Sequence, residues 1–434
     1  MEITPMPPTS TTLTQPLIAV LPREKIEQEA QRLGVVVRRR IVDIHALVWT
    51  LVLGFQTGSR RTISTLHWTY QKATGHRLSR SSFYDRFTSE FATLLRILAQ
   101  EAITSLGDIR GVSPQLLTGF RELLALDSTV VRLHALLAKA YGACRTNHTK
   151  AAAKLHVVMN VLDGSPRRVK LTPERTNDQT PWRQVGRWLE GCLLLFDLGY
   201  FSYHLFERID RNGGFFLTRC KANTNPLIVA VHRKWRGRSV PLTGLRLKEI
   251  LPTLHRKVLD VQVEIEFKRR PYLGYQTRVR RTFRLIAIRN DQTGAYHVYL
   301  TNLPADRLHA QDVQALYALR WQVELLFKAL KSHGRLDQLP SANQDIVEAW
   351  VWASILATAT SQALYRMIRS AMRADRFVPL LRWAGVFARV AADLLRLLLH
   401  PEALESYQLL QLLIREAVDP NVNRKHRALN LSIA

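Results

Sequence analysis

Cysteine is scarce in this chain. Its 434 residues include three cysteines, Cys144, Cys192 and Cys220, and no two of them form a CxxC pair. A disulfide-stapled fold needs denser cysteines, and structural zinc sites bring theirs in close pairs. The sequence therefore argues against both kinds of stabilisation and is typical of a protein that works in a reducing cytoplasm.

Acidic residues are also few. The chain has 35 Asp and Glu against 62 Lys and Arg, a net charge of +27. This excess is spread along the chain and favours a polyanionic partner, nucleic acid before an anionic membrane surface.

Long uncharged hydrophobic runs are missing as well. The most apolar stretches, Val347–Leu364 and Val378–Leu399, contain charged residues, so we expect buried helices and no membrane span. Met1–Pro22 is rich in Thr and Pro and has no basic segment before an apolar core, which predicts a flexible tail rather than a signal peptide.

The most informative stretch present is Tyr317–Lys331, which has no Gly or Pro and predicts one helix. Trp321 and Lys328 flank its polar face, and an apolar stripe lies opposite. A carboxylate among cations suits a metal-dependent phosphate enzyme, because the acid binds metal and the cations bind phosphate; a solvated charged face is the alternative. At about 100° per residue, the polar face contains Tyr317, Arg320, Glu324 and Lys331.

The spacing of these four polar residues carries a resemblance. Two residues separate Tyr from Arg, three separate Arg from Glu and six separate Glu from Lys. This pattern resembles the Tyr-Arg-Glu-Lys signature of one group of bacterial insertion-sequence DDE transposases. The resemblance implies a ribonuclease H-like, retroviral-integrase-like catalytic core, with two more acidic residues upstream.

Two aspartates have suitable contexts. Leu123–Asp127 and Cys192–Asp197 are apolar runs closed by an acid, which predicts buried strands of an α/β sheet. A carboxylate at the end of such a strand is rigid and partly desolvated, as suits a metal ligand. Both contexts also resemble the aspartate motifs of this transposase group, although Leu198 replaces an arginine common there.

The intervening sequence predicts two more strands, Ala151–Leu162 and Arg168–Pro173, and a helix over Pro181–Leu189. Strand, strand, strand, helix, strand is the order of a ribonuclease H-like core. Asp260 also follows apolar residues, but it belongs to the alternating strand Leu259–Phe267, which predicts that its side chain faces solvent.

Residues 223–301 have a β-like pattern, with further strands at Phe283–Ile288 and Tyr296–Leu300 joined by a hairpin loop at 290–294. A basic cluster beside Trp235 suits phosphate binding with base stacking, while charged protection of a sheet edge is the alternative. The basic residues proposed as DNA contacts there are Arg233, Lys234 and Arg236.

The amino-terminal region predicts helices, among them Thr62–Thr74 and one that begins after Ser79 and contains Phe83, Phe87 and Phe91. Two helices joined by a short Gly-containing turn favour a helix-turn-helix-like DNA-binding unit; an ordinary helical bundle is the alternative. In this interpretation the residues near DNA are Arg77, Arg80, Ser81, Ser82, Tyr84 and Arg86.

We therefore predict an α/β fold: a ribonuclease H-like mixed sheet flanked by helices, with a β-rich insertion and helical N- and C-terminal regions. The predicted parts are a flexible tail (1–22), a helical DNA-binding domain (23–115), the first part of the core (116–222), the insertion (223–301), the core's signature helix (302–340) and a helical C-terminal region suited to dimerisation (341–434).

The three acids Asp127, Asp197 and Glu324 are the predicted catalytic residues and metal ligands. Oxygen ligands favour Mg²⁺, with Mn²⁺ as a substitute, and three carboxylates suit two ions about 3.5–4 Å apart. The resemblance implies cutting at the terminal inverted repeats of an insertion sequence and joining of the 3′-ends to target DNA. It also implies double-stranded DNA and a homodimer as partners, a bacterial cytoplasmic location at the nucleoid, and phosphate or base contacts by Tyr317, Arg320, Lys331, Trp321 and Lys328.

Three other hypotheses remain open at this point. A metal-dependent DNA nuclease without strand transfer would keep the same acids. A recombinase with Tyr317 as nucleophile would need an Arg/His cluster and no metal. A non-catalytic transposase-derived DNA-binding protein would typically have lost an acid, and none is missing here.

Overall fold

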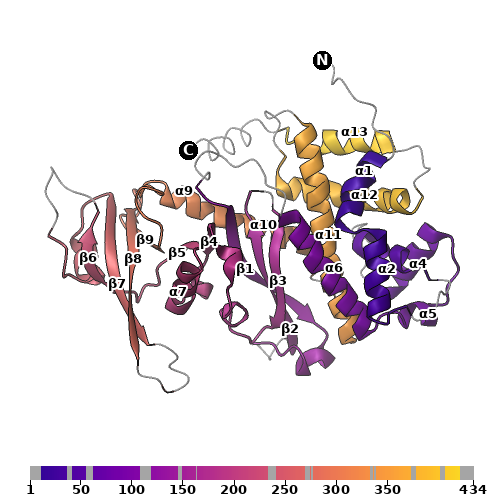
Figure 1. Cartoon of the computed structure of the whole chain (residues 1–434), viewed down its shortest axis with the longest axis horizontal. Helices are drawn as coiled ribbons and strands as arrows, with labels where there is room; N and C mark the ends of the chain where they lie inside the picture. Colours follow the sequence, from indigo (N-terminus) through magenta and orange to yellow (C-terminus); the bar gives the residue numbers. More distant parts are fainter. Residues whose placement is uncertain are drawn as a thin grey trace, which may run out of the picture.

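A mixed β-sheet forms the centre of the protein (Figure 1). The computed structural model describes residues 11–36, 42–54, 62–107, 119–144, 149–162, 164–232, 241–268, 274, 277–332, 336, 339–372, 378–400 and 406–420.

Five strands of this sheet have the order β3-β2-β1-β4-β5. β1 runs antiparallel to β2 and parallel to β4, β3 runs antiparallel to β2, and β5 runs parallel to β4. This order and these directions are those of a ribonuclease H-like core, so the predicted fold class is confirmed. The strands are β1 (Glu122–Leu133), β2 (Ala151–Asn160), β3 (Pro166–Pro173), β4 (Cys192–Phe196) and β5 (Phe215–Arg219).

The β-rich segment extends the same sheet. β9 pairs antiparallel with β5, and the order continues β9-β8-β7-β6, so backbone hydrogen bonds run from the core into the insertion without a break. The predicted hairpin loop is present between β8 and β9, where Gly294 adopts a φ of 71° that favours glycine. The elements are β6 (Leu227–Val231), α8 (Leu247–Ile250), β7 (Val258–Lys268), β8 (Arg278–Arg289) and β9 (Tyr296–Thr301).

The predicted solvent exposure of Asp260 is wrong. This residue is buried, and both of its carboxylate oxygens accept hydrogen bonds from Arg284 of β8, at 2.8 and 2.6 Å. Alternation along β7 correctly places Asp260 on the face opposite Leu259 and Val261, but that face is not open to solvent at this position. Arg284 on the neighbouring strand supplies the charge that lets the acid be buried there.

The two faces of the core are covered by different helices. α6 (Ser89–Gly107), α10 (Gln322–Ser332) and α11 (Gln344–Ala371) cover one face, and their apolar residues join Leu123 and Ala125 of β1 in one core. α7 (Tyr203–Arg211) covers the other face and packs on Phe196. The helix predicted over Pro181–Leu189 is wrong, because two short 3₁₀ turns, Thr180–Trp182 and Arg187–Leu189, occupy that stretch.

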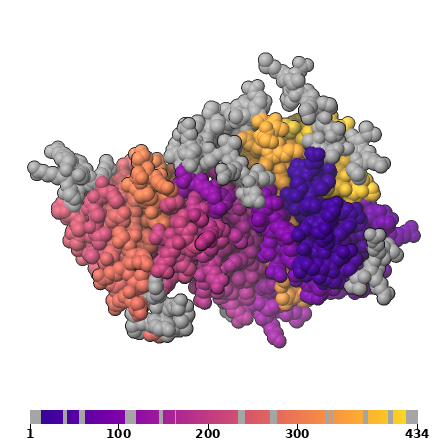
Figure 2. Space-filling view, viewed as in Figure 1, coloured from indigo at the N-terminus to yellow at the C-terminus, as the bar shows by residue number. Residues whose placement is uncertain are grey.

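Helices at both ends of the chain form the opposite end of the molecule from β6–β9 (Figure 1), and the surface shows the same succession (Figure 2). α1 packs on α11, and α3 packs on α12, so the two ends of the chain share one core. The flexible tail predicted for residues 1–22 is wrong from residue 11 onward, because α1 buries Leu13 and Leu17 in this core. These helices are α1 (Thr11–Val20), α2 (Arg23–Arg32), α3 (Ile44–Gly54), α4 (Ile63–Thr74), α5 (Arg80–Tyr84), α12 (Leu380–Leu399) and α13 (Ser406–Ala417).

The predicted helix after Ser79 is two helices. Ser79 does cap α5, but α5 ends at Tyr84 and α6 begins at Ser89. Phe83, Phe87 and Phe91 still pack on one another, with ring centroids 5.7 and 5.8 Å apart. The aromatic spacing therefore predicted the contact correctly and the uninterrupted helix wrongly.

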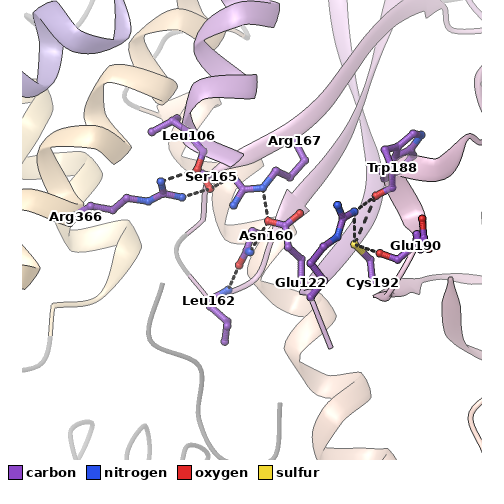
Figure 3. Close-up of polar contacts among 11 residues, drawn as sticks. Leu106, Glu122, Asn160, Leu162, Ser165, Arg167, Trp188, Glu190, Cys192 and Arg366 are labelled. Carbon is purple, nitrogen blue, oxygen red and sulfur yellow. Dashed lines mark hydrogen bonds and ion pairs between the residues drawn. The ribbon is translucent and has the colours of Figure 1, made fainter. Parts of the chain in front are cut away.

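Polar contacts join the sheet to the helices on its face (Figure 3). Arg366 of α11 donates to the carbonyl of Leu106 in α6 and to the hydroxyl of Ser165 just before β3. Arg167 of β3 forms an ion pair of 2.5 Å with Glu122 at the start of β1. Within the described ranges, no helix is long and apolar enough to cross a membrane.

Candidate active site

The two predicted aspartates follow paired positions of parallel strands. Leu126 of β1 is the partner of Phe196 of β4, so Asp127 and Asp197 are the residues that follow this pair on the two neighbouring strands. Asp127 Oδ1 accepts from the backbone N–H of Ser128 at 2.7 Å. Asp197 begins a 3₁₀ turn, and its Oδ1 accepts from the N–H of Gly199 at 2.9 Å. The carboxyl edge of two parallel strands thus presents both acids.

Glu324 reaches the same place from a helix. The stretch predicted as one helix consists of α9 (Val313–Ala318), a 3₁₀ turn (Leu319–Trp321) and α10, whose first turn contains Glu324. The apolar stripe of α10 is buried as predicted, with Val323, Leu326 and Leu330 in the core, and α10 packs against β1. This packing turns the opposite face of the segment toward Asp127.

Arg320 joins the strand acid to the helix acid. Its Nη1 lies 3.3 Å from Asp127 Oδ2, and its Nη2 lies 2.7 Å from Glu324 Oε1. The side chains of Arg320 and Asp127 are each only 16% exposed, so this is a part-buried pair rather than a solvated surface contact.

The acids act on one another electrostatically. Burial raises the pKa of Asp127 to about 6, and the charges of Asp197 and Glu324 raise it as well. The N–H of Ser128 and the charge of Arg320 oppose this rise in the pKa. Asp127 therefore feels the charges of both other predicted acids, and Arg320 pairs with two of the three.

The other predicted site residues differ in their surroundings. The Tyr317 hydroxyl donates to the carbonyl of Phe196 at 3.3 Å, and burial raises the Tyr317 pKa. Trp321 is 55% exposed, Lys328 is exposed and Lys331 is half-buried. The cluster of Arg233, Lys234 and Arg236 lies outside the described residues.

A fourth carboxylate, which the sequence did not predict, is Asp178 in the loop after β3. It accepts from the hydroxyl of Ser128 at 3.2 Å and pairs with Lys154 at 3.0 Å. A β-carbon added at Gly199 would lie 3.1 Å from Asp197 Oδ1 and 3.5 Å from Asp178 Oδ2, so both carboxylates lie against this glycine. Asp178 follows no apolar run, and no sequence signal marks it.

The chemical type of these side chains suits a divalent metal ion. Carboxylate oxygens are the ligands that Mg²⁺ and Mn²⁺ prefer, and the mutual repulsion of these acids would be relieved by a cation. In the part of the chain that the structure describes, no three acidic, His or Cys side chains stand ready to hold a metal ion together. The Arg320 guanidinium lies between two of the three acids instead.

Comparisons with known proteins identify the family of this chain. Residues 118–359, more than half of the chain, match the family model of the transposase DDE domain. The transposase of insertion sequence element IS231F from Bacillus thuringiensis subsp. israelensis is 24% identical over 71% of this chain and 69% of its own length. The IS231B transposase from subsp. berliner is 22% identical over 79% and 77%.

Among solved structures, the piggyBac transposase synaptic complex with hairpin DNA aligns with 94% of this chain and 85% of its own. The sequence identity is 10% and the TM-score 0.47, too low for a shared fold to be inferred from that alignment. The family model, the insertion-sequence relatives and the ribonuclease H-like sheet agree, and the chain belongs to the DDE transposases of bacterial insertion sequences.

Proposed function

We propose that this transposase binds the terminal inverted repeats of its insertion sequence, cuts a phosphodiester bond at each end and joins the 3′-ends to target DNA. The observation that supports this most strongly is that Asp127 of β1 and Asp197, just after β4, follow paired residues of neighbouring strands, while Arg320 links Asp127 to Glu324 of α10.

Asp127, Asp197 and Glu324 would hold two Mg²⁺ ions, with Mn²⁺ as a substitute. Bound there, the ions would supply activation of a water or 3′-hydroxyl and charge compensation at the leaving oxygen. Asp127 and Asp197 are fixed by backbone N–H groups, so the protein presents these ligands with little reorganisation.

In this proposal the cations of the signature segment, Tyr317–Lys331, bind DNA phosphates. Arg320 can offer two N–H groups to one phosphate, and Lys331 and Lys328 add point charges near the same strand. The exposed indole of Trp321 can stack on a base that leaves the duplex. Tyr317 holds α9 to the last residue of β4, next to Asp197, and contact with a phosphate would require its hydroxyl to turn.

The net charge of +27 supports DNA as the partner. Binding should then weaken steeply with salt, by about 10³–10⁵ between 50 and 200 mM if six to ten phosphates are contacted. Fluorescence anisotropy with the element's own ends measures this slope, and light scattering of the complex tests the homodimer. A salt-independent affinity, or one protein chain per synapsed pair of ends, would contradict these parts of the proposal.

The decisive experiment is cleavage of labelled DNA that carries the element's ends. Asp197→Ala and Glu324→Ala should bind this DNA like the wild type but cut it at least about a thousandfold more slowly, as should the wild type in EDTA. Joined products separate a transposase from a nuclease without strand transfer. Cutting that survives EDTA or either substitution would refute the three-acid site.

A further inference from the structure

The Arg320 guanidinium spans two acids that belong to different elements. One terminal nitrogen lies 3.3 Å from Asp127 Oδ2 on β1, and the other lies 2.7 Å from Glu324 Oε1 on α10. Its side chain is 16% exposed, so burial favours one fixed arrangement. Both bonded oxygens are ones that a divalent ion at this site would use.

The position of Arg320 makes it a competitor for these oxygens. An arginine cannot give up its proton in a protein, so only movement of the guanidinium can release the acids. A DNA phosphate offers such a side chain a bidentate alternative of similar charge and geometry. The Tyr317 ring lies next to this guanidinium, with its centroid 6.0 Å from Arg320 Cζ.

We propose that Arg320 is an internal counter-ion of the metal site: it holds Asp127 and Glu324 until a DNA phosphate draws it away, and thereby couples metal binding to DNA binding. The inference rests on the proposed function of the three acids. Linkage then requires that DNA raise the affinity for metal and that metal raise the affinity for DNA by the same factor. Without its DNA, the protein binds metal weakly and is protected from cutting at random.

The first test uses Mn²⁺ alone, titrated into the full chain without DNA and followed by electron paramagnetic resonance. Arg320→Gln removes one positive charge from between two ligands and should bind Mn²⁺ about tenfold or more tightly than the wild type. Arg167→Gln is the matched control, because Arg167 is also largely buried and pairs with Glu122 at the start of β1 (Figure 3). It should leave Mn²⁺ binding unchanged.

The second test adds duplex DNA that carries the element's ends. The DNA should tighten Mn²⁺ binding by the wild type. It should have little effect on Mn²⁺ binding by Arg320→Gln, in which no guanidinium holds Asp127 and Glu324. A role for Arg320 as a phosphate contact alone predicts a different result, since the substitution would then weaken DNA binding without changing Mn²⁺ binding in the absence of DNA.

Glu324→Ala separates failure of this inference from failure of the proposed function. If Glu324→Ala leaves Mn²⁺ binding unchanged in both the wild-type and Arg320→Gln backgrounds, the ion is not held by these acids and the proposed function itself fails. If Glu324→Ala weakens binding but Arg320→Gln binds Mn²⁺ no more tightly than the wild type, the counter-ion role is overturned alone. Should Arg320→Gln fail to fold, Arg320→Lys replaces it. One ammonium cannot span both acids, so Arg320→Lys should tighten Mn²⁺ binding by a smaller factor. If Arg320→Lys binds Mn²⁺ no more tightly than the wild type, the proposal is overturned.

Discussion

At the scale of single residues, Asp127 is held at a cost to stability. Burial raises its pKa from 3.8 to about 6, so the folded protein retains a proton that the unfolded chain releases. Stability from this group is therefore present below about pH 4 and is lost as the pH rises to about 6. A carboxylate kept ionised at neutral pH in such a place is typical of a functional site.

Asp127→Asn should consequently stabilise the metal-free protein at high pH. Asn can still accept from Ser128 but carries no charge, so we expect a gain of about 1–3 kcal/mol at pH 8 and none at pH 4. Urea unfolding in EDTA at both pH values measures this, with Asp291→Asn, an exposed partner of Lys257, as the control. A loss of stability at pH 8 would contradict the assignment of the raised pKa to Asp127.

Asp178 is the residue whose substitution we expect to affect the site indirectly. Asp178→Asn keeps an acceptor for Ser128 but leaves Lys154, whose side chain is 13% exposed, without its counter-charge. We expect a loss of about 1–2 kcal/mol in stability, and cleavage slowed about tenfold with DNA binding unchanged. Ser128→Ala cuts only the link to β1 and should have a smaller effect. Wild-type cleavage rates in Asp178→Asn would restrict this residue to a role in folding.

The same scale shows what sequence can predict of this site. Asp127 and Asp197 follow apolar runs and have neighbours that resemble a known motif, so both could be located. Asp178 lies in a polar loop, where nothing in the sequence distinguishes one acid from another. Asp260 was misjudged because its partner Arg284 lies 24 residues away, and pairing across strands leaves no local trace.

At the scale of elements, hydrophobic periodicity located the strands and the buried stripe of α10, because burial on one face leaves a regular pattern. The breaks were not predicted. The 3₁₀ turn between α9 and α10, and the end of α5 before α6, come from tertiary packing and local capping that helical spacing does not record. The break at Leu319–Trp321 bears on the proposed site, because it contains Arg320.

Tyr317 tests how α9 is attached to the site. Tyr317→Phe removes the hydroxyl that donates to the Phe196 carbonyl, and we expect a loss of about 0.5–1.5 kcal/mol in the free energy of unfolding. Tyr365→Phe is the control, since that hydroxyl donates to the Val378 carbonyl, at 3.1 Å, between helices of the C-terminal region. Both should lose similar stability, whereas slower DNA cleavage is expected for Tyr317→Phe alone. Equal cleavage by the two variants would remove Tyr317 from the site.

At the scale of the whole molecule, one sheet runs from the core through the insertion, and the chain must return from β9 to α9 to complete the site. The buried side chain of Arg284 contacts this connection between β9 and α9. Arg284 binds both oxygens of Asp260 and donates to the carbonyls of Leu303, Pro304 and Leu308, at 3.4, 3.2 and 2.7 Å. The insertion thereby fixes the segment that leads into Arg320 and Glu324.

Arg284→Met should therefore destabilise the core and the insertion together. It leaves Asp260 buried without a charge partner and frees three carbonyls, for an expected loss of about 3–5 kcal/mol. Arg280→Met on the same strand is the matched control, because Arg280 is 67% exposed, pairs with Glu266, and should cost less than about 1 kcal/mol. Since the sheet is continuous, urea unfolding of Arg284→Met followed by hydrogen exchange should show β5 and β8 losing protection together. Loss confined to β6–β9 would mean that the insertion unfolds separately and does not support the signature segment.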